Sequence, residues 1–189
     1  RNDGQWRIEE TWPPLDTEPF TVQLGSCSYD GVFVGGGPPV VGGGQTITID
    51  CPNINPDFDM HISGLATIHL TAVPTFDGGQ VFVEMQDAQT GMRVGHATMD
   101  VRYHAGGSEP QTVTPGSAVT MMMEFQAIDA IIPAGNGLRF FLTDTGEDYL
   151  APACGPACVL HVLPSLSVFE APLIDRDGSN VLITAQRDD

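Results

Sequence analysis

The chain has 189 residues, 41% of them hydrophobic, which suits a single domain with a sizeable core. Its 24 acidic residues face seven arginines and no lysine, so the formal net charge is −17. Nucleic acid and anionic membrane surfaces bind clusters of Lys and Arg, which excludes both as partners, and no apolar run reaches the roughly 18 residues of a membrane-spanning helix.

Short strand patterns separated by Gly, Pro, Asp and Asn recur along the chain, and helical periodicity is nearly absent. The first two predicted strands cover residues 20–24 and 46–50. The Gly-rich segment 35–44 between them predicts a flexible loop. It does not have the Lys-Ser/Thr pair and following helix of a phosphate-binding loop.

The middle of the chain shows the period of two that a half-buried strand requires. Residues 68–72 and 81–86 alternate apolar and polar side chains. The clearest pattern runs from Gly95 to His104, where His96, Thr98 and other polar residues alternate with an apolar set. The pattern predicts one continuous strand over 95–104 with one polar and one buried face.

The second half continues in the same way. A Met-rich apolar run over 119–132 is followed by the turn 133–137 and by a strand over 138–142, in which Leu138, Phe140 and Leu142 form one buried face. Further strands are predicted at 159–163 and 180–184. Eight or more short antiparallel strands predict an all-β, two-sheet antiparallel sandwich of the jelly-roll, galactose-binding-like type, while the lack of crossover helices excludes parallel βαβ units.

The four cysteines favour two disulfides, Cys27–Cys51 and Cys154–Cys158, and thus an oxidising, extracellular or cell-surface location. The spacing Cys154-Gly-Pro-Ala-Cys158 differs from that of a zinc knuckle. Buried free thiols are the alternative. The chain begins at Arg1, as expected either of a processed mature protein or of a segment of a longer one.

The strong acidity has two interpretations. A soluble, self-repelling surface is typical of many exported proteins. Adaptation to saline water is the more specific interpretation, because dissolved salt screens the repulsion between carboxylates.

The patterns of known catalytic sites are missing from the sequence. No serine lies in a Gly-x-Ser-x-Gly frame, although a triad built from other elements is recognised by geometry rather than by pattern. The five histidines do not follow the His-Glu-x-x-His spacing. His96 and His104 would lie about 26 Å apart on one strand, too far to share an ion. We therefore assign no catalytic residue and expect exposed or cross-strand-paired histidines.

Calcium is the metal that the composition favours, because it takes several oxygen ligands from loops. The main candidate is the acidic cluster Asp144, Glu147 and Asp148. The loops 53–59 and 175–180 are also acidic, but the second has neither the closing Glu nor the helices of an EF-hand. Solvated acidic loops without metal are the alternative, and no other cofactor is expected.

The order of the segments between residues 60 and 150 carries a family resemblance. It begins with "HISG", followed by a strand that ends in "VEMQD", a hairpin, and a strand that ends in "DVRY". A Pro-Gly turn and the "IPAGNGLR" turn and strand complete the series, and "WRIEETWPP" at residues 6–14 resembles the start of the same domain. The series resembles the C-terminal jelly-roll domain of the X-Pro dipeptidyl-peptidase and cocaine-esterase family.

The resemblance implies one jelly-roll domain over residues 1–189, with 6–165 similar to the family domain and 166–189 forming an extension or last strand. The loop 154–158 and the tail after Leu163 have no counterpart that can be mapped. Enzymes of this family carry their Ser-Asp-His triad in a preceding α/β-hydrolase domain, which is not in this sequence. The resemblance therefore implies a non-catalytic accessory domain of a serine hydrolase. Such a domain steadies the hydrolase domain and shapes substrate access or oligomer contacts.

Two other classes of function compete with this interpretation. A free-standing carbohydrate-binding module would need aromatic rings on which a sugar can stack, and Trp6 and Trp12 are more simply expected to pack against the sandwich. A structural subunit of an extracellular assembly could use terminal strands to pair with a neighbour.

Overall fold

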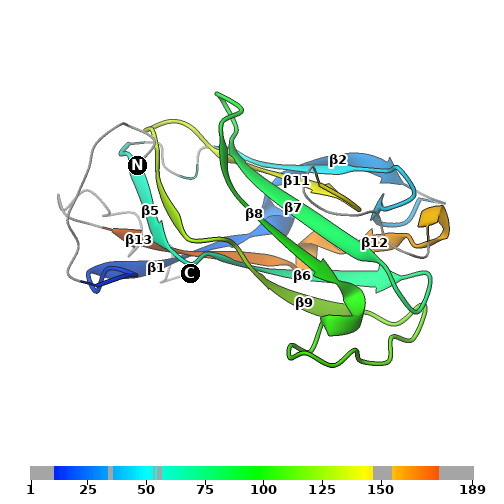
Figure 1. Ribbon diagram of the computed structural model, residues 1–189. Coiled ribbons are helices and arrows are strands. Elements are labelled where there is room, and N and C mark those ends of the chain that lie inside the picture. The colour runs from blue at the N-terminus through cyan, green and yellow to red at the C-terminus, as the bar shows by residue number, and fades with distance from the viewer. Residues whose placement is uncertain (1–10, 34–35, 53, 55–56, 147–154, 175–189) are drawn as a thin grey trace.

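The computed structural model of the protein describes residues 11–33, 36–52, 54, 57–146 and 155–174 (Figure 1). Across these residues the chain forms thirteen strands, and every strand pairing is antiparallel. Only short 3-10 turns interrupt them: η1 (Leu24–Ser26), η2 (Val101–Tyr103), η3 (Gly155–Ala157) and η4 (Pro164–Leu166). The predicted all-β, antiparallel class is confirmed. No helix in the described ranges is long and apolar enough to cross a membrane.

The first layer, which we name sheet A, is organised around β6 (Thr67–Pro74). One edge of β6 pairs with β9, and the other edge pairs first with β13 and then with β12. The remaining members are β1 (Thr17–Gln23), β3 (Pro39–Val41), β5 (Met60–Gly64), β9 (Val119–Glu124), β10 (Ile128–Ile132), β12 (Leu160–Val162) and β13 (Val168–Ile174).

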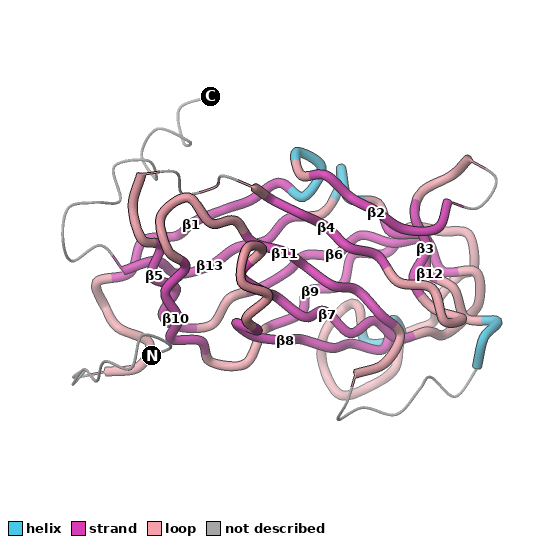
Figure 2. Tube along the Cα trace, turned by 90° about the horizontal axis from the view of Figure 1, so that it is seen from above, coloured by secondary structure: helices cyan, strands magenta, loops and turns pink. Residues whose placement is uncertain are grey.

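The second layer, sheet B, contains β4 (Ile47–Cys51), β11 (Leu138–Thr143), β7 (Gln80–Asp87) and β8 (Arg93–Asp100) in that order. Figure 2 looks down on these four strands running side by side. β2 (Ser28–Phe33) pairs with β4 in its first half and with β3 in its second half. The two layers of the predicted sandwich are therefore joined by hydrogen bonds through one shared strand.

Inward-facing side chains of the two layers meet in one hydrophobic core. Phe140 of sheet B lies with its ring centre 5.0 Å from that of Phe169 in sheet A, and Phe125 meets Phe169 edge-on at 5.9 Å. Leu138, Phe140 and Leu142 are fully buried, which confirms the predicted face of β11. Strand alternation thus fixes which residues of each layer remain available outside.

The prediction of one strand over 95–104 is wrong at its end. β8 stops at Asp100, whose carboxylate accepts the backbone N–H of Arg102 at 2.9 Å and caps η2. Val101 is buried and donates its N–H to the carbonyl of Gly79. Arg102 and His104 therefore lie in a turn, because a local side-chain cap competes with the strand ladder.

The Met-rich run 119–132 is likewise two strands rather than one. Between β9 and β10, the N–H of Phe125 donates to Ala66 in the link between β5 and β6, and that of Gln126 donates to His96 in sheet B. The chain passes here from pairing with β6 to pairing with β5. β8 and β10 approach each other closely at Gly95, which has no side chain. A Cβ at this position would lie only 3.1 Å from Ile128 of β10.

Three strands were not predicted as such, β2, β3 and β5, whereas for 166–189 a last strand was one of the two expectations. β13 falls in the segment 166–189, and it lies inside sheet A with partners on both sides. Where β6 changes partner from β13 to β12, the Ser167 hydroxyl accepts the Thr71 N–H at 3.0 Å. The predicted strand 180–184 lies outside the described residues.

Candidate functional site: the outer faces of the sandwich

The outer face of sheet B is a grid of side chains set by the strand register. Residues that are directly opposite each other across antiparallel strands share a face. One row runs Thr98–Phe82–Thr143, the next runs His96–Glu84–Phe141–Thr48–Asp30, and the third runs Arg93–Gln86–Arg139–Asp50–Ser28. This face therefore combines aromatic rings, both signs of charge and hydroxyl groups.

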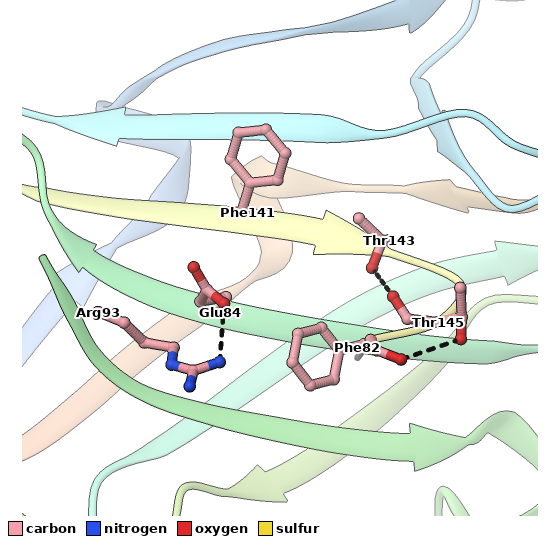
Figure 3. Close-up of a pocket in the computed structure, with 7 residues that line it drawn as sticks. Phe82, Glu84, Arg93, Phe141, Thr143 and Thr145 are labelled. Carbon is pink, nitrogen blue, oxygen red and sulfur yellow. Dashed lines mark hydrogen bonds and ion pairs between the residues drawn. The ribbon is translucent and has the colours of Figure 1, made fainter. Parts of the chain in front are cut away.

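A hollow of about 280 Å³ lies on this face, between β11, β7 and β8 and the start of the loop that follows β11. Figure 3 shows the rings of Phe82 and Phe141 on its walls, with the Glu84–Arg93 pair beside them. The Phe82 ring stacks on His96 with 5.4 Å between ring centres and is only 7% exposed, whereas Phe141 is 37% exposed. The hollow thus has one fixed aromatic wall and one accessible aromatic ring.

Arginine is confined to this side of the described molecule. Arg93 lies 3.6 Å from Glu84, and Arg139 donates from Nε to Asp50 at 2.6 Å. Arg102, in the turn directly after β8, pairs with Asp100. In a chain of net charge −17, the described cations are concentrated on sheet B and at its end.

The outer face of sheet A carries a second hollow of about 280 Å³ with different chemistry. Thr17, Pro19, Leu65, Thr67, Glu170 and Pro172 contribute to its lining. It contains neither an aromatic ring nor a cationic side chain. These two hollows are therefore alike in volume but unlike in the side chains that line them.

Ser63, His61 and Asp129 form a cluster whose composition matches a catalytic triad. All three lie on the outer face of sheet A, where β5 pairs with β10, and His61 Nε2 bonds Asp129 at 2.6 Å. Ser63, however, is fully buried and its hydroxyl has no hydrogen-bond partner. A nucleophile must be reachable and bonded to its base. The His61–Asp129 contact is instead a cross-strand pair of the kind expected for these histidines.

The calcium candidate is only partly described. Asp144 lies just beyond β11, and its backbone carbonyl accepts a hydrogen bond from Gln80. Glu147 and Asp148 lie outside the described residues, as does the loop 175–180, so the site stays a prediction. Among the residues that the structure does describe, no three His, Cys, Asp or Glu side chains are grouped to hold a metal.

Cys27 and Cys51 are joined by a disulfide, the pairing that the sequence favours. It links the start of β2 to the end of β4 across the edge of sheet B. Cys158 is also disulfide-bonded, and its predicted partner Cys154 lies outside the described ranges. The disulfide is consistent with an oxidising compartment.

Asp87 is a buried acid at the end of β7 that the sequence did not single out. Burial alone would raise the pKa of its carboxyl group, but hydrogen bonds from Asn136 and from the backbone N–H groups of Thr90 and Gln89 outweigh this, so the pKa is lowered. Asp87 thereby ties the β7–β8 turn to the turn before β11. The "DAQT" stretch that follows the strand is typical of an Asx turn and could have indicated it.

Trp12 is 47% exposed, so its predicted packing against the sandwich is incomplete. Trp6 lies outside the described residues. In the described part of the chain, the accessible aromatic rings include Trp12, Phe76 and Phe141, and of these Phe141 lines a hollow.

The sequence of residues 57–149 matches the profile of the X-Pro dipeptidyl-peptidase C-terminal non-catalytic domain. The matched range covers just under half of the chain. This range contains the described strands β5 to β11, and it is similar to a domain that is non-catalytic and C-terminal in its family. No curated protein matches the chain in sequence.

Solved structures share the fold of this chain at low identity. An aminopeptidase from a marine sediment archaeon, Thaumarchaeota archaeon, aligns with a TM-score of 0.65 and 9% identity over 92% of this chain and 39% of its own. A CocE/NonD family hydrolase from Staphylococcus aureus aligns with a TM-score of 0.59 and 9% identity, over 90% of this chain and 39% of its own. An α-amino acid ester hydrolase aligns with a TM-score of 0.53 and 13% identity, over 88% of this chain and 34% of its own. The chain thus spans little more than a third of each of these proteins.

Proposed function

We propose that this C-terminal domain belongs to a larger secreted serine hydrolase that acts on peptides or esters, and that it stabilises the α/β-hydrolase domain and shapes access to its active site. The observation that carries the proposal is the match of residues 57–149 to a non-catalytic domain. The fold likeness to longer hydrolase and aminopeptidase chains supports it.

The complete reading frame tests this proposal first. We expect an upstream α/β-hydrolase domain with a Gly-x-Ser-x-Gly elbow. The full-length protein is then compared with a version truncated before this domain. Loss of several degrees of thermal stability in the hydrolase part, together with an altered KM, is the expected result. A gene without a hydrolase domain, or a truncation that leaves both quantities unchanged, would contradict the proposal.

Secretion and adaptation to salt are further parts of the proposal. The Cys27–Cys51 disulfide supports an oxidising location, and the net charge of −17 supports a saline one. Stability against urea should rise between low and molar NaCl, because screening relieves repulsion between the acids. A control with the same concentration of a neutral osmolyte separates screening from general exclusion effects.

Self-association is supported by exposed apolar side chains on β2, the strand that both sheets share. Tyr29, Val32 and Phe33 are each more than 40% exposed. Light scattering over a wide concentration range would detect a dimer, and a constant monomer mass would remove this part of the proposal.

Binding of carbohydrate is the second candidate, favoured by the accessible Phe141 ring beside Glu84 and Thr143 in the hollow. An aromatic ring with neighbouring polar groups is the arrangement on which sugars stack. A glycan array in which Phe141→Ala abolishes binding would support it, and the absence of any bound glycan at high protein concentration would count against it.

A further inference from the structure

The outer face of sheet B has the composition of a protein-binding surface. The central regions of such surfaces are enriched in aromatic residues and arginine, and they have few unpaired charges. Here Phe141 and Phe82 line a hollow, and Arg93 and Arg139 stand in the row beside them, each close to an acid. The charges of this face are therefore largely balanced locally, which lowers the cost of removing them from water.

Phe141 occupies the centre of the face and not its rim. It lies on β11, between β4 and β7, and its direct neighbours across the strands are Thr48 and Glu84. It nevertheless remains 37% exposed, because the loop after β11 covers Phe82 instead: a Cβ on Gly146 would lie 2.8 Å from the Phe82 ring. A ring in the middle of a hollowed face is well placed for an apolar side chain of a partner.

The charge distribution decides which kind of partner fits. The chain has a net charge of −17, and the arginines of the described residues all lie on sheet B or in the turn at its end. An acidic partner would be repelled by most of this molecule and least by this face. Because Glu84 and Asp50 offset the charges of Arg93 and Arg139, this face is close to neutral and opposes the approach of another protein least.

The geometry points to the outer face of sheet B as the surface on which the hydrolase part of the same protein docks. That partner presents an apolar side chain to the hollow beside Phe141. This inference rests on the proposed function, which requires a hydrolase part but does not say which face it contacts. The opposite hollow on sheet A, with Glu170 in its lining, is the alternative contact face.

Hydroxyl-radical footprinting of the unmodified full-length protein tests the inference. The oxidation rates of Phe141 and of Met122 on the outer face of sheet A are each divided by the rate in the unfolded protein. In the domain alone the two side chains are 37% and 59% exposed, so their normalised rates would be within a factor of two. Docking on sheet B should slow the oxidation of Phe141 by at least about fivefold relative to Met122, because the centre of an interface is desolvated.

Two variants of the full-length protein complete the experiment. Phe141→Asp should lower the thermal stability of the hydrolase part towards that of the truncated protein, and the matched control Met122→Asp should leave it unchanged. If Met122 is the protected residue and Met122→Asp the damaging change, sheet A is the contact face and the inference is overturned while the accessory function stands. If truncation itself has no effect, the proposed function fails. Equal oxidation of both residues, with truncation still destabilising, also overturns the inference.

Discussion

The two outer faces of the sandwich have hollows of the same size and opposite character. On sheet B the lining contains Phe82, Phe141 and Arg93, whereas on sheet A it contains prolines, threonines and Glu170. Both faces are made by the outward half of alternating strands around one core. The fold therefore provides two equivalent platforms, and only the outward residues distinguish them.

The difference between the two faces shows that one alternating pattern both builds the core, through its inward residues, and sets the chemistry of the surface, through its outward residues. On β11 the inward set is uniformly apolar and fully buried, while the outward set contains Arg139, Phe141 and Thr143. On β9 the inward methionines are buried, and the outward Met122 lies opposite His69 and is exposed. Single exposed apolar side chains are common, but an aromatic ring beside a hollow and two arginines is a specific combination.

The largest expected loss of stability comes from the inward side of β11, and it can be compared with the loss from the outward side. Phe140→Ala should destabilise the chain by about 4 kcal/mol, since it removes a fully buried ring that contacts Phe169 of sheet A. Phe141→Ala should cost less than about 1 kcal/mol, because its ring is partly in water already. Urea denaturation of the purified chain measures both. A large loss for Phe141→Ala would mean that the ring serves the fold, which weakens its assignment to docking.

Removal of the Cys27–Cys51 disulfide should have the next largest effect, and it should weaken sheet B more than sheet A. The Cys27→Ser, Cys51→Ser double variant should lose about 3 kcal/mol, because the bond closes a loop between residues 24 positions apart. Hydrogen exchange should then show β2 and β4 of sheet B opening before β6 and β9 of sheet A. A uniform loss of protection across both sheets would show that the bond stabilises the whole sandwich rather than the edge of sheet B.

The sequence predicts the inward half of the molecule better than the outward half. Alternation at 68–72, 81–86 and 138–142 identifies strands correctly, because burial imposes the period of two. It fails where hydrogen bonds from outside the strand intervene, as at Asp100, whose carboxylate ends β8, and at Phe125, whose N–H bonds to Ala66. β2 was missed because its residues are mostly exposed and two sheets share it.

The outward site could not be read from the sequence because its members are brought together only by strand register. Phe82, Arg93 and Phe141 are far apart in the chain, and their placement on one face depends on the pairing of β7 with both β8 and β11. A one-residue shift in register would send each of them to the core. Two adjacent phenylalanines at 140 and 141 indicate that one ring points outward, but they do not indicate what lies beside it.

Asp87 offers a smaller, pH-dependent test at the end of sheet B. Its pKa is lower in the folded chain than in the unfolded one, so its stabilisation is complete above the unfolded pKa of about 4 and is lost as the pH falls through the folded value. Asp87→Asn should therefore cost about 2 kcal/mol at pH 7, and the gap from the native chain should close below about pH 4.

Denaturation curves between pH 2.5 and 7 would measure this gap, with the range chosen to bracket the unfolded pKa of about 4. Glu124→Gln, an exposed acid on the outer face of sheet A, is the matched control and should show no such dependence. A gap for Asp87→Asn that is constant with pH would show that the side chain acts through shape and hydrogen bonding alone, without its charge.

The smallest effects are expected from two side-chain contacts to acids, one on each face. Arg93→Gln on sheet B and His69→Gln on sheet A break pairs of 3.6 Å and 3.7 Å between partly exposed groups, and each should change the stability of the chain by less than about 0.5 kcal/mol. Thermal or urea unfolding of both variants measures this. Arg93 is about half exposed, so it adds little to the fold and stays accessible to the docking partner that we propose. A loss above about 1 kcal/mol for Arg93→Gln alone would instead make the Glu84–Arg93 pair a clamp between β7 and β8. The arginines of sheet B would then no longer distinguish it from sheet A as the docking face.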